Sequence, residues 1–285
     1  MEIFDHFVMM FGMDPTNMPA YAKIMTFVVP LFVIVFYGHM ALKKIINTGS
    51  AIRNIARGMR VDKNAGPSPD ELRKIAVGAL YASQQGGYVN TLRLDINKVR
   101  LSTILGEWWG ITNREEAVAT INYLASAPSA TTLPIVLAAI KAPDMVEREK
   151  IVNREIGDDG DKKERAMSQI DNYFKIKNEL VSDGLTSSPT TLLPPGVMAW
   201  DAGRLNFIAR ASMEKGYISE RECRSAVDAA YEMARSAGFK DWREFAASYM
   251  LGRGLWGGNL DMSHLAEELL TKPDSPWAKV TWQAK

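Results

Sequence analysis

Two short stretches of the sequence combine arginine with aromatic residues at helical spacing. Trp200 and Arg204 are four residues apart, so a helix places both on one face. Tyr249, Arg253 and Trp256 follow one another at spacings of four and three. Arginine binds carboxylate and phosphate groups through two parallel hydrogen bonds. These residues therefore predict either a buried polar network or a site for an anionic group.

Two carboxylates accompany these arginines. Asp201 precedes Arg204 by three residues, so the two side chains can pair on the same helix. Glu107 lies in a third aromatic stretch, 106–110 (GEWWG). In an enzyme, Asp201 or Glu107 would be the candidate general base that activates water. In a structural network, Asp201 would instead neutralise a buried arginine.

Other catalytic sites have little support in the sequence. The three histidines are His6, His39 and His264, and the single cysteine, Cys223, has no histidine near it in sequence. We therefore expect no metal, no cofactor and no Ser–His–Asp triad, and we interpret Cys223 as a packing residue. Residues 252–257 match the dinucleotide-binding pattern GxGxxG, but they follow a helical pattern rather than a strand. We expect these glycines to end a helix.

The chain after residue 68 is predicted to be all-α. Four candidate helix starts have a hydroxyl or aspartate followed three residues later by glutamate. These pairs are Ser68–Glu71, Thr112–Glu115, Ser219–Glu222 and Asp241–Glu244. Helices are predicted to begin near residues 69, 113, 162, 199, 220, 242 and 262, because apolar residues recur there every three or four positions.

The domain organisation follows from these helices and from the segments between them. We expect one compact helical domain over residues 69–272 and a tail over 273–285. Within the domain, 157–163 (GDDGDKK) is predicted to be a charged loop, and the proline-rich stretch 182–196 is predicted to be a flap or a subdomain boundary.

The N-terminal region predicts a membrane anchor. Residues 24–42 are 19 positions without Asp, Glu, Lys or Arg, and a helix of that length covers about 28 Å, close to the hydrocarbon thickness of a bilayer. A buried core helix is the alternative. Residues 43–68, a juxtamembrane segment and linker, are basic, and such charge favours the cytoplasmic side. Residues 1–23 should then lie outside, and the large C-terminal domain should lie in the cytoplasm of a bacterium, at its inner membrane.

Charge also indicates partners. The basic residues expected to contact anionic lipid headgroups are Lys43, Lys44, Arg53, Arg57 and Arg60. The whole chain has 34 basic and 33 acidic residues, a net charge of +1, so no nucleic-acid partner is expected. A protein partner remains an open alternative.

Three ordered stretches, 106–124, 199–222 and 239–256, resemble the bacterial domain of unknown function 1266. The characteristic elements are Trp109-Gly110-Ile111, Trp200-Asp201-x-Gly203-Arg204, Gly216-Tyr217-Ile218, and Trp242 through Gly252-Arg253-x-x-Trp256. The resemblance covers roughly residues 77–256. It implies a helical domain and brings neither an established activity nor catalytic residues.

Two functions fit these observations. The first is a membrane-tethered interaction or scaffold domain. The second is a hydrolase or transferase for an anionic substrate, with Arg204 and Arg253 binding the anion and Glu107 or Asp201 acting as base. The residues predicted to bind are Trp200, Arg204, Trp242, Tyr249, Arg253 and Trp256. The lack of a histidine or metal cluster favours the first function, although the sequence leaves open whether the chain is an enzyme.

Overall fold

The computed structural model describes residues 59–182 and 196–283, which belong to one compact unit. These residues form helices and no β-strand, which confirms the predicted all-α fold; Arg60 and Tyr88 make an isolated bridge. The helices are α3 (Pro69–Ala76), α4 (Ala79–Gln85), α5 (Lys98–Ser102), the π-helix η1 (Thr103–Trp108), α6 (Arg114–Ala125), α7 (Pro128–Ile140), α8 (Met145–Ile156), α9 (Gly160–Ser182), α10 (Met198–Glu214), α11 (Glu220–Ser236), α12 (Trp242–Gly257), α13 (Ser263–Thr271) and α14 (Pro276–Lys279).

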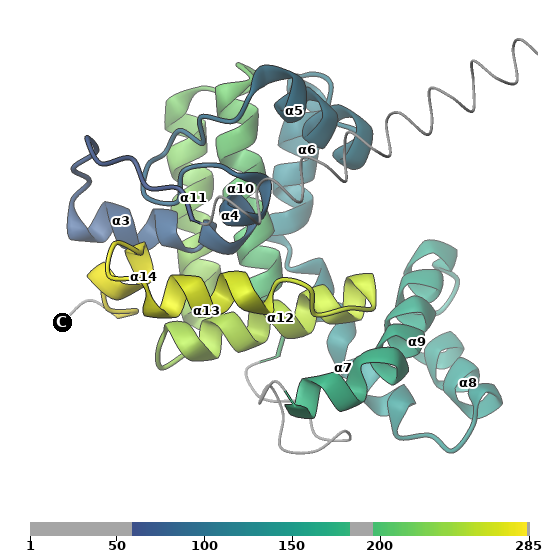
Figure 1. Cartoon of the computed structure of the whole chain (residues 1–285). Helices are drawn as coiled ribbons and strands as arrows, with labels where there is room; N and C mark the ends of the chain where they lie inside the picture. The colour runs from purple at the N-terminus through teal and green to yellow at the C-terminus, as the bar shows by residue number, and fades with distance from the viewer. Residues whose placement is uncertain (1–58, 183–195, 284–285) are drawn as a thin grey trace, which may run out of the picture. The chain divides into compact units, whose positions relative to one another are not determined.

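Helix α10 is the central helix of the domain. Every residue from Ala199 to Ser212 is buried. The helix packs lengthwise against α11 and also contacts α4, α6 and α12 (Figure 1). A helix that is covered on all sides must satisfy its polar side chains inside the protein. The charged side chains of α10 must therefore form their hydrogen bonds and ion pairs with the helices and segments that surround it.

Two glycines allow α10 and α12 to approach closely. A Cβ atom on Gly252 would lie 2.3 Å from the Cβ of Trp200. A Cβ atom on Gly203 would lie 2.6 Å from Cε2 of Tyr249. Real Cβ atoms are not found at such distances, so each glycine makes room for an aromatic side chain of the facing helix. This contact brings the two aromatic and arginine stretches of the sequence together.

The C-terminal segment belongs to the core, which corrects the prediction of a tail from residue 273. Trp277 stacks on Trp242 with ring centroids 5.2 Å apart, and its Nε1 donates to the carbonyl of Ala76 at 2.9 Å. Trp282 is also buried and lies edge-on to Trp242 at 4.7 Å. Burial of two indole side chains removes a large apolar area from water, which explains why this segment packs.

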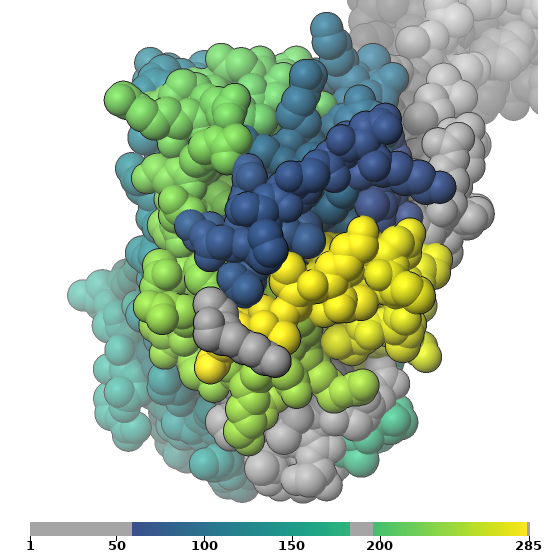
Figure 2. Space-filling model, turned by 90° about the vertical axis from the view of Figure 1, so that its left-hand side faces the viewer, coloured from purple at the N-terminus to yellow at the C-terminus, as the bar shows by residue number. Residues whose placement is uncertain are grey.

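The first described residues also pack on the domain, although they were expected to belong to a linker. Asn90 exchanges hydrogen bonds with the backbone of Asp62, at 2.9 and 2.8 Å. Helix α3 lies beside the C-terminal α14, and Figure 2 shows these two ends of the described chain side by side on one face. The compact domain therefore begins before residue 69.

Helices α7, α8 and α9 form a smaller helical layer with its own apolar core. This core consists of Val136, Ala139, Val152, Ala166 and Ile170. The layer joins the rest of the domain mainly where α9 packs on α12 and where α7 meets α10 (Figure 1). The predicted charged loop 157–163 is shorter than expected, because Asp159 accepts a hydrogen bond from the backbone N–H of Lys162 and α9 already begins at Gly160.

The predicted helix starts are confirmed with one shift. Ser219 and Glu222 form a reciprocal capping box, and Ser68 and Asp241 are N-caps of α3 and α12. The pair at Thr112 is displaced by one residue, since Asn113 is the N-cap of α6 and accepts from the backbone N–H of Glu116. Hydrogen bonds from Arg114 and then Ser219 hold the pKa of the Glu222 carboxyl well below its usual range.

The predicted membrane span, residues 24–42, and the positions 183–195 of the predicted flap lie outside the described residues. Within 59–182 and 196–283, no single helix has the length and hydropathy needed to cross a bilayer. Helices α6 and α7 reach those limits only when taken together, and they are bent by 44° at the break between them. Cys223 is buried in α11, and burial raises the pKa of its thiol to about 12, as expected for a packing residue.

Candidate functional site

The aromatic and arginine stretches that are far apart in sequence meet around Trp200 on α10. The Cζ of Arg204 lies 4.6 Å from the ring centroid of Trp200 and 5.9 Å from that of Trp109. The ring centroids of Tyr249 and Trp256 lie 5.1 and 6.0 Å from that of Trp200. We call this group, with Asp201 and Arg253, the motif cluster. It contains the predicted residues of both Trp–Arg stretches except Trp242, together with Trp109.

Asp201 connects the motif cluster to α7. Its carboxylate is fully buried and pairs with Arg204 through Oδ1. Its Oδ2 accepts the backbone N–H groups of Ser129 and Ala130 at 2.9 and 3.0 Å. The N-cap residue of α7, Ala127, has no side chain that could accept them. Asp201 therefore caps α7 from another helix and places a negative charge at its positive end.

Arg204 is held in place but still reaches a pocket. Its Nη2 also donates to Ser129 Oγ at 2.9 Å, and its Nε donates to the Trp200 carbonyl at 3.3 Å. Only 9% of the side chain is exposed, and that part lines the pocket described below. Arg204 thus takes part in the internal hydrogen-bond network and also forms part of the pocket wall, where a ligand can reach it.

Arg253 is less completely paired than Arg204. One guanidinium nitrogen, Nη2, lies 3.3 Å from Asp261 Oδ1, while Nη1 is buried and has no hydrogen-bond partner among the described residues. The same holds for Trp200 Nε1 and the Tyr249 hydroxyl. Burial raises the pKa of Tyr249 above its usual range, so its hydroxyl stays protonated. The motif cluster therefore has more hydrogen-bond donors than acceptors, which favours oxygen-rich or anionic groups nearby.

A pocket of about 470 Å³ lies beside the motif cluster, between α6, α7, α9 and α12. We call it the cationic pocket. Its described lining residues include Lys162, Arg165 and Arg204 and no Asp or Glu. Among the described residues, neither Lys162 nor Arg165 has a carboxylate partner. Unpaired cations that face a shared cavity create a positive potential there, which attracts anions.

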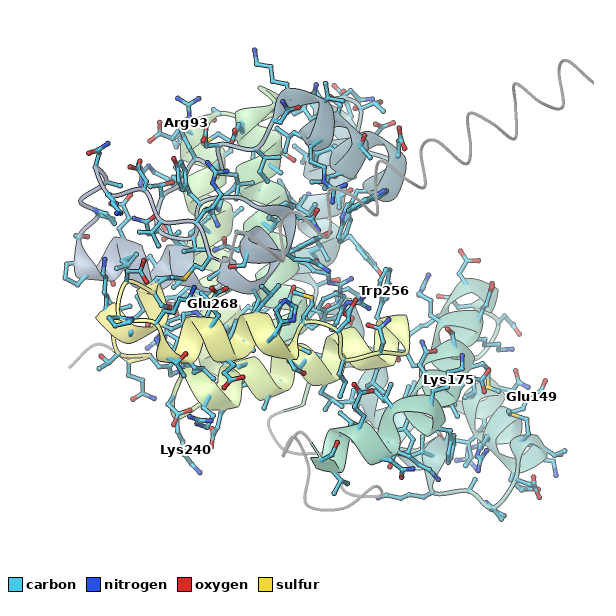
Figure 3. The ribbon with its side chains drawn as sticks, viewed as in Figure 1. Arg93, Glu149, Lys175, Lys240, Trp256 and Glu268 are labelled. Carbon is cyan, nitrogen blue, oxygen red and sulfur yellow. The ribbon has the colours of Figure 1, made fainter. Side chains whose placement is uncertain are left out.

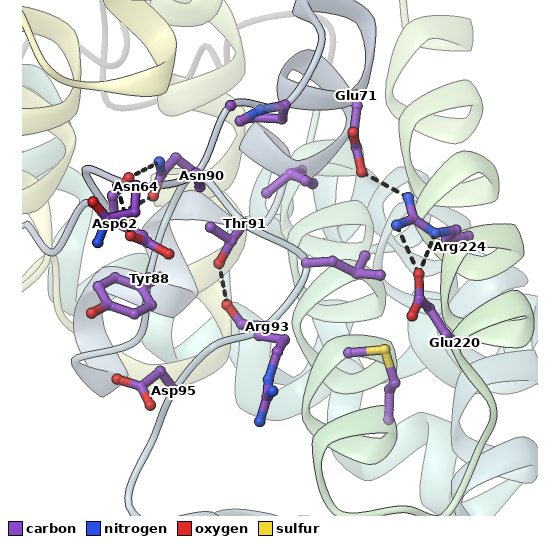
Figure 4. A pocket seen from close by; sticks show the side chains of 16 residues that line it. Asp62, Asn64, Glu71, Tyr88, Asn90, Thr91, Arg93, Asp95, Glu220 and Arg224 are labelled. Atoms are coloured by element: carbon purple, nitrogen blue, oxygen red, sulfur yellow. Dashed lines mark hydrogen bonds and ion pairs between the residues drawn. The ribbon is translucent and has the colours of Figure 1, made fainter.

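A second, larger pocket of about 710 Å³ has a different charge pattern (Figure 4). It lies between the segments 62–67 and 88–95 and the start of α11. Its described lining includes four carboxylates, of Asp62, Glu71, Asp95 and Glu220, and two arginines, Arg93 and Arg224. Arg224 pairs with Glu71 at 2.7 Å and with Glu220 at 2.8 Å. Since carboxylates outnumber arginines, this pocket offers a weaker attraction for anions than the cationic pocket.

Two predicted site residues lie elsewhere. Trp242 is part of the aromatic core and donates through Nε1 to the Val280 carbonyl at 2.8 Å. Glu107 is exposed on η1 and does not line the cationic pocket. The proposed base roles therefore have little geometric support: Glu107 is outside the pocket, and both oxygens of Asp201 are occupied by internal hydrogen bonds.

Sequence analysis missed the pocket residues on α6 and α9 and a buried arginine. Lys162 and Arg165 are three residues apart on α9, a spacing that could have indicated one cationic helix face. Arg210 is fully buried in α10 and donates to the carbonyls of Tyr88 and Thr91 at 2.6 Å and to that of Leu92 at 3.2 Å. Burial lowers the pKa of Arg210 to about 10, so it remains charged at neutral pH.

Comparisons with known proteins agree with the motif pattern. No curated protein and no solved structure matches the chain significantly. Residues 104–282, more than half of the chain, match a family described as "Protein of unknown function (DUF1266)". This range includes Trp109, Trp200, Arg204, Arg253 and Trp256, and it extends past the resemblance expected from the motifs to include Trp282. The chain therefore belongs to the DUF1266 family.

Proposed function

We propose that this protein is a non-catalytic interaction module that recognises an anionic group in the cationic pocket and is tethered to a membrane by residues 24–42. The observation that carries the proposal is the lining of the pocket, to which residues 59–182 and 196–283 contribute Lys162, Arg165 and Arg204 but no carboxylate. An anion bound there would contact the cations Lys162 and Arg165, the exposed part of Arg204, which is paired with Asp201, and several hydroxyl groups. The volume of about 470 Å³ falls in the range of small-molecule sites.

A binding role fits the pocket better than hydrolysis or group transfer. A general base must reach the proton that it removes. Asp201 is buried and already accepts from Arg204, Ser129 and Ala130. Since no carboxylate of the described residues lines the cationic pocket, a substrate held there would meet no carboxylate base from this part of the chain. The enzymatic alternative would need a base other than these carboxylates.

Charge reversal in the pocket is expected to weaken anion binding. Lys162→Glu and Arg165→Glu should each weaken the binding of inorganic pyrophosphate by at least about tenfold, because each replaces an attraction by a repulsion at the wall of the pocket. Isothermal titration calorimetry of the full-length protein at low and moderate ionic strength measures this effect. The affinity of the parent should fall as salt is added.

Lys163→Glu is the matched control for this experiment. It makes the same charge change one position along α9, and Lys163 does not line the pocket. We expect its affinity to stay within about threefold of the parent, since a charge that does not line the pocket acts on a bound anion only at longer range and through solvent and salt. Equal losses for Lys163→Glu and Arg165→Glu would mean that only net charge matters, and lack of pyrophosphate binding by the parent would refute an anion site.

The tether is the second part of the proposal, supported by the uncharged run 24–42 and the basic residues after it. The full-length chain is expected to fractionate with bacterial inner membranes and to resist extraction by carbonate. A reporter enzyme fused after Lys285 should be active when the reporter works only in the cytoplasm. Activity only of a periplasmic reporter would reverse the orientation, and recovery of the chain in the soluble fraction would remove the tether.

A further inference from the structure

The cationic pocket also has an aromatic side. Trp256 on α12 and Tyr123 on α6 both line it, and they are 61% and 48% exposed. Among the described residues, the large exposed hydrophobic side chains include only one further aromatic residue, Trp108, which is outside this pocket. An exposed indole beside a cavity leaves apolar surface in water that a ligand ring can cover.

The indole of Trp256 is supported on the protein side. Its ring centroid lies 6.0 Å from that of Trp200, and the Arg253 guanidinium carbon lies 5.4 Å from it. Figure 3 shows Trp256 near the end of α12, where this helix faces α9. Since neighbouring groups already restrict the ring, a planar ligand that stacks on it would lose little additional side-chain entropy.

Hydroxyl groups line another part of the same pocket. Ser126, Ser129 and Thr131 come from the start of α7 and the residue stretch before it, and Ser168 comes from α9. Ser129 Oγ already accepts from Arg204 at 2.9 Å, which places one hydroxyl directly beside a cationic group. The pocket therefore combines cations, hydroxyls and exposed aromatic rings, three groups that suit phosphate, sugar and base respectively.

From this combination, we propose that the anionic ligand of the cationic pocket is a nucleotide, with its phosphates toward Lys162 and Arg165 and its base against Trp256. This inference rests on the proposed function, because it names the ligand class of the same site. A phenyl phosphate group, as in phosphotyrosine, would use the cations and a ring but not the hydroxyls. A free inorganic phosphate would use the cations alone.

The test compares ligands that carry one, two or all three of these chemical groups. The full-length protein is titrated calorimetrically with AMP, ADP, GDP, ribose 5-phosphate, phenyl phosphate and inorganic pyrophosphate. Because stacking on an aromatic side chain contributes substantially to nucleotide binding, we expect ADP or GDP to bind at least about tenfold more tightly than ribose 5-phosphate and pyrophosphate. Phenyl phosphate should bind more weakly than AMP.

Substitutions of Trp256 then test whether this side chain causes the preference for nucleotides. Trp256→Ala should remove the preference for nucleotides over ribose 5-phosphate, whereas Trp256→Phe should retain part of this preference. Trp108→Ala is the matched control, since Trp108 is 46% exposed and lies outside the pocket. Circular dichroism confirms that each variant is folded, and Tyr123→Ala provides a second test on another helix.

Each outcome decides between the two proposals. Loss of the nucleotide preference in Trp256→Ala but not in Trp108→Ala supports the inference. Pyrophosphate binding without any preference for nucleotides overturns the inference and leaves the anion site intact. Equal affinity for phenyl phosphate and AMP also overturns it, because the hydroxyl groups would then have no role. Absence of binding by every ligand overturns the anion site together with the inference.

Discussion

Replacing Asp201 by alanine is expected to lower the free energy of unfolding by about 3–5 kcal/mol, because it leaves the buried Arg204 guanidinium without its counter-charge. It also leaves the backbone N–H groups of Ser129 and Ala130 without an acceptor at the start of α7. For a domain of this size the melting temperature should fall by roughly 10 °C. Thermal and urea unfolding of the full-length protein, followed by circular dichroism, measure both quantities.

Two further variants test whether the loss of stability comes from the unpaired charge of the buried Arg204. Asp228→Ala removes an exposed carboxylate that pairs with Lys74 at 3.1 Å, and it should cost less than about 1 kcal/mol. The double variant Asp201→Ala, Arg204→Leu should recover part of the stability, since no buried charge remains unpaired. A melting temperature for Asp201→Ala within a degree or two of the parent would contradict a buried network and would favour a solvated, ligand-facing Asp201.

Arg210→Met is expected to have an effect of similar size, about 3–5 kcal/mol, although no carboxylate in the described part of the chain pairs with Arg210. The guanidinium donates to the carbonyls of Tyr88, Thr91 and Leu92 and thereby holds the segment 88–92 against α10. Methionine fills part of the space but donates no hydrogen bond, so these carbonyls lose their donors. Urea unfolding measures the loss, and hydrogen exchange should show faster opening of residues 88–95.

Arg210→Lys distinguishes charge from geometry. Lysine keeps the positive charge, but its single nitrogen cannot serve the carbonyls that the planar guanidinium serves from several atoms, so we expect only partial rescue. Arg235→Met is the matched control, because Arg235 is 59% exposed and pairs locally with Glu232; its stability should stay within about 0.5 kcal/mol of the parent. Full stability of Arg210→Met would show that water replaces the guanidinium at these carbonyls.

Short-range patterns predicted several capped helices and the central ion pair, but they missed α8, although its N-cap Asp144 accepts from the backbone N–H of Glu147. Ser219 and Glu222 are three residues apart and form the expected box, and Asp201 pairs with Arg204 at the same spacing. In both cases, helix geometry alone brings the side chains together. Helix α7 was not predicted, because Pro134 lies inside it and its N-cap position holds an alanine. Such a helix depends on contacts with the rest of the domain.

The partners of the buried polar groups depend on how the helices pack. Asp201 caps a helix that starts more than 70 residues before it, with separations of 72 and 71 residues to Ser129 and Ala130. Arg210 binds carbonyls 118 to 122 residues away. Every residue has a backbone carbonyl and almost every residue has an N–H group, so no residue type marks these partners in the sequence.

The cationic pocket likewise arises from packing. Lys162 lies in the predicted charged loop 157–163, Arg165 lies just after it, and Trp256 belongs to one of the aromatic and arginine stretches. Only the contacts of α9 with α12 and of α7 with α10 bring them to one cavity. The sequence contained the chemical groups of the site, but their relative positions follow from apolar burial along four helices, which no local spacing specifies.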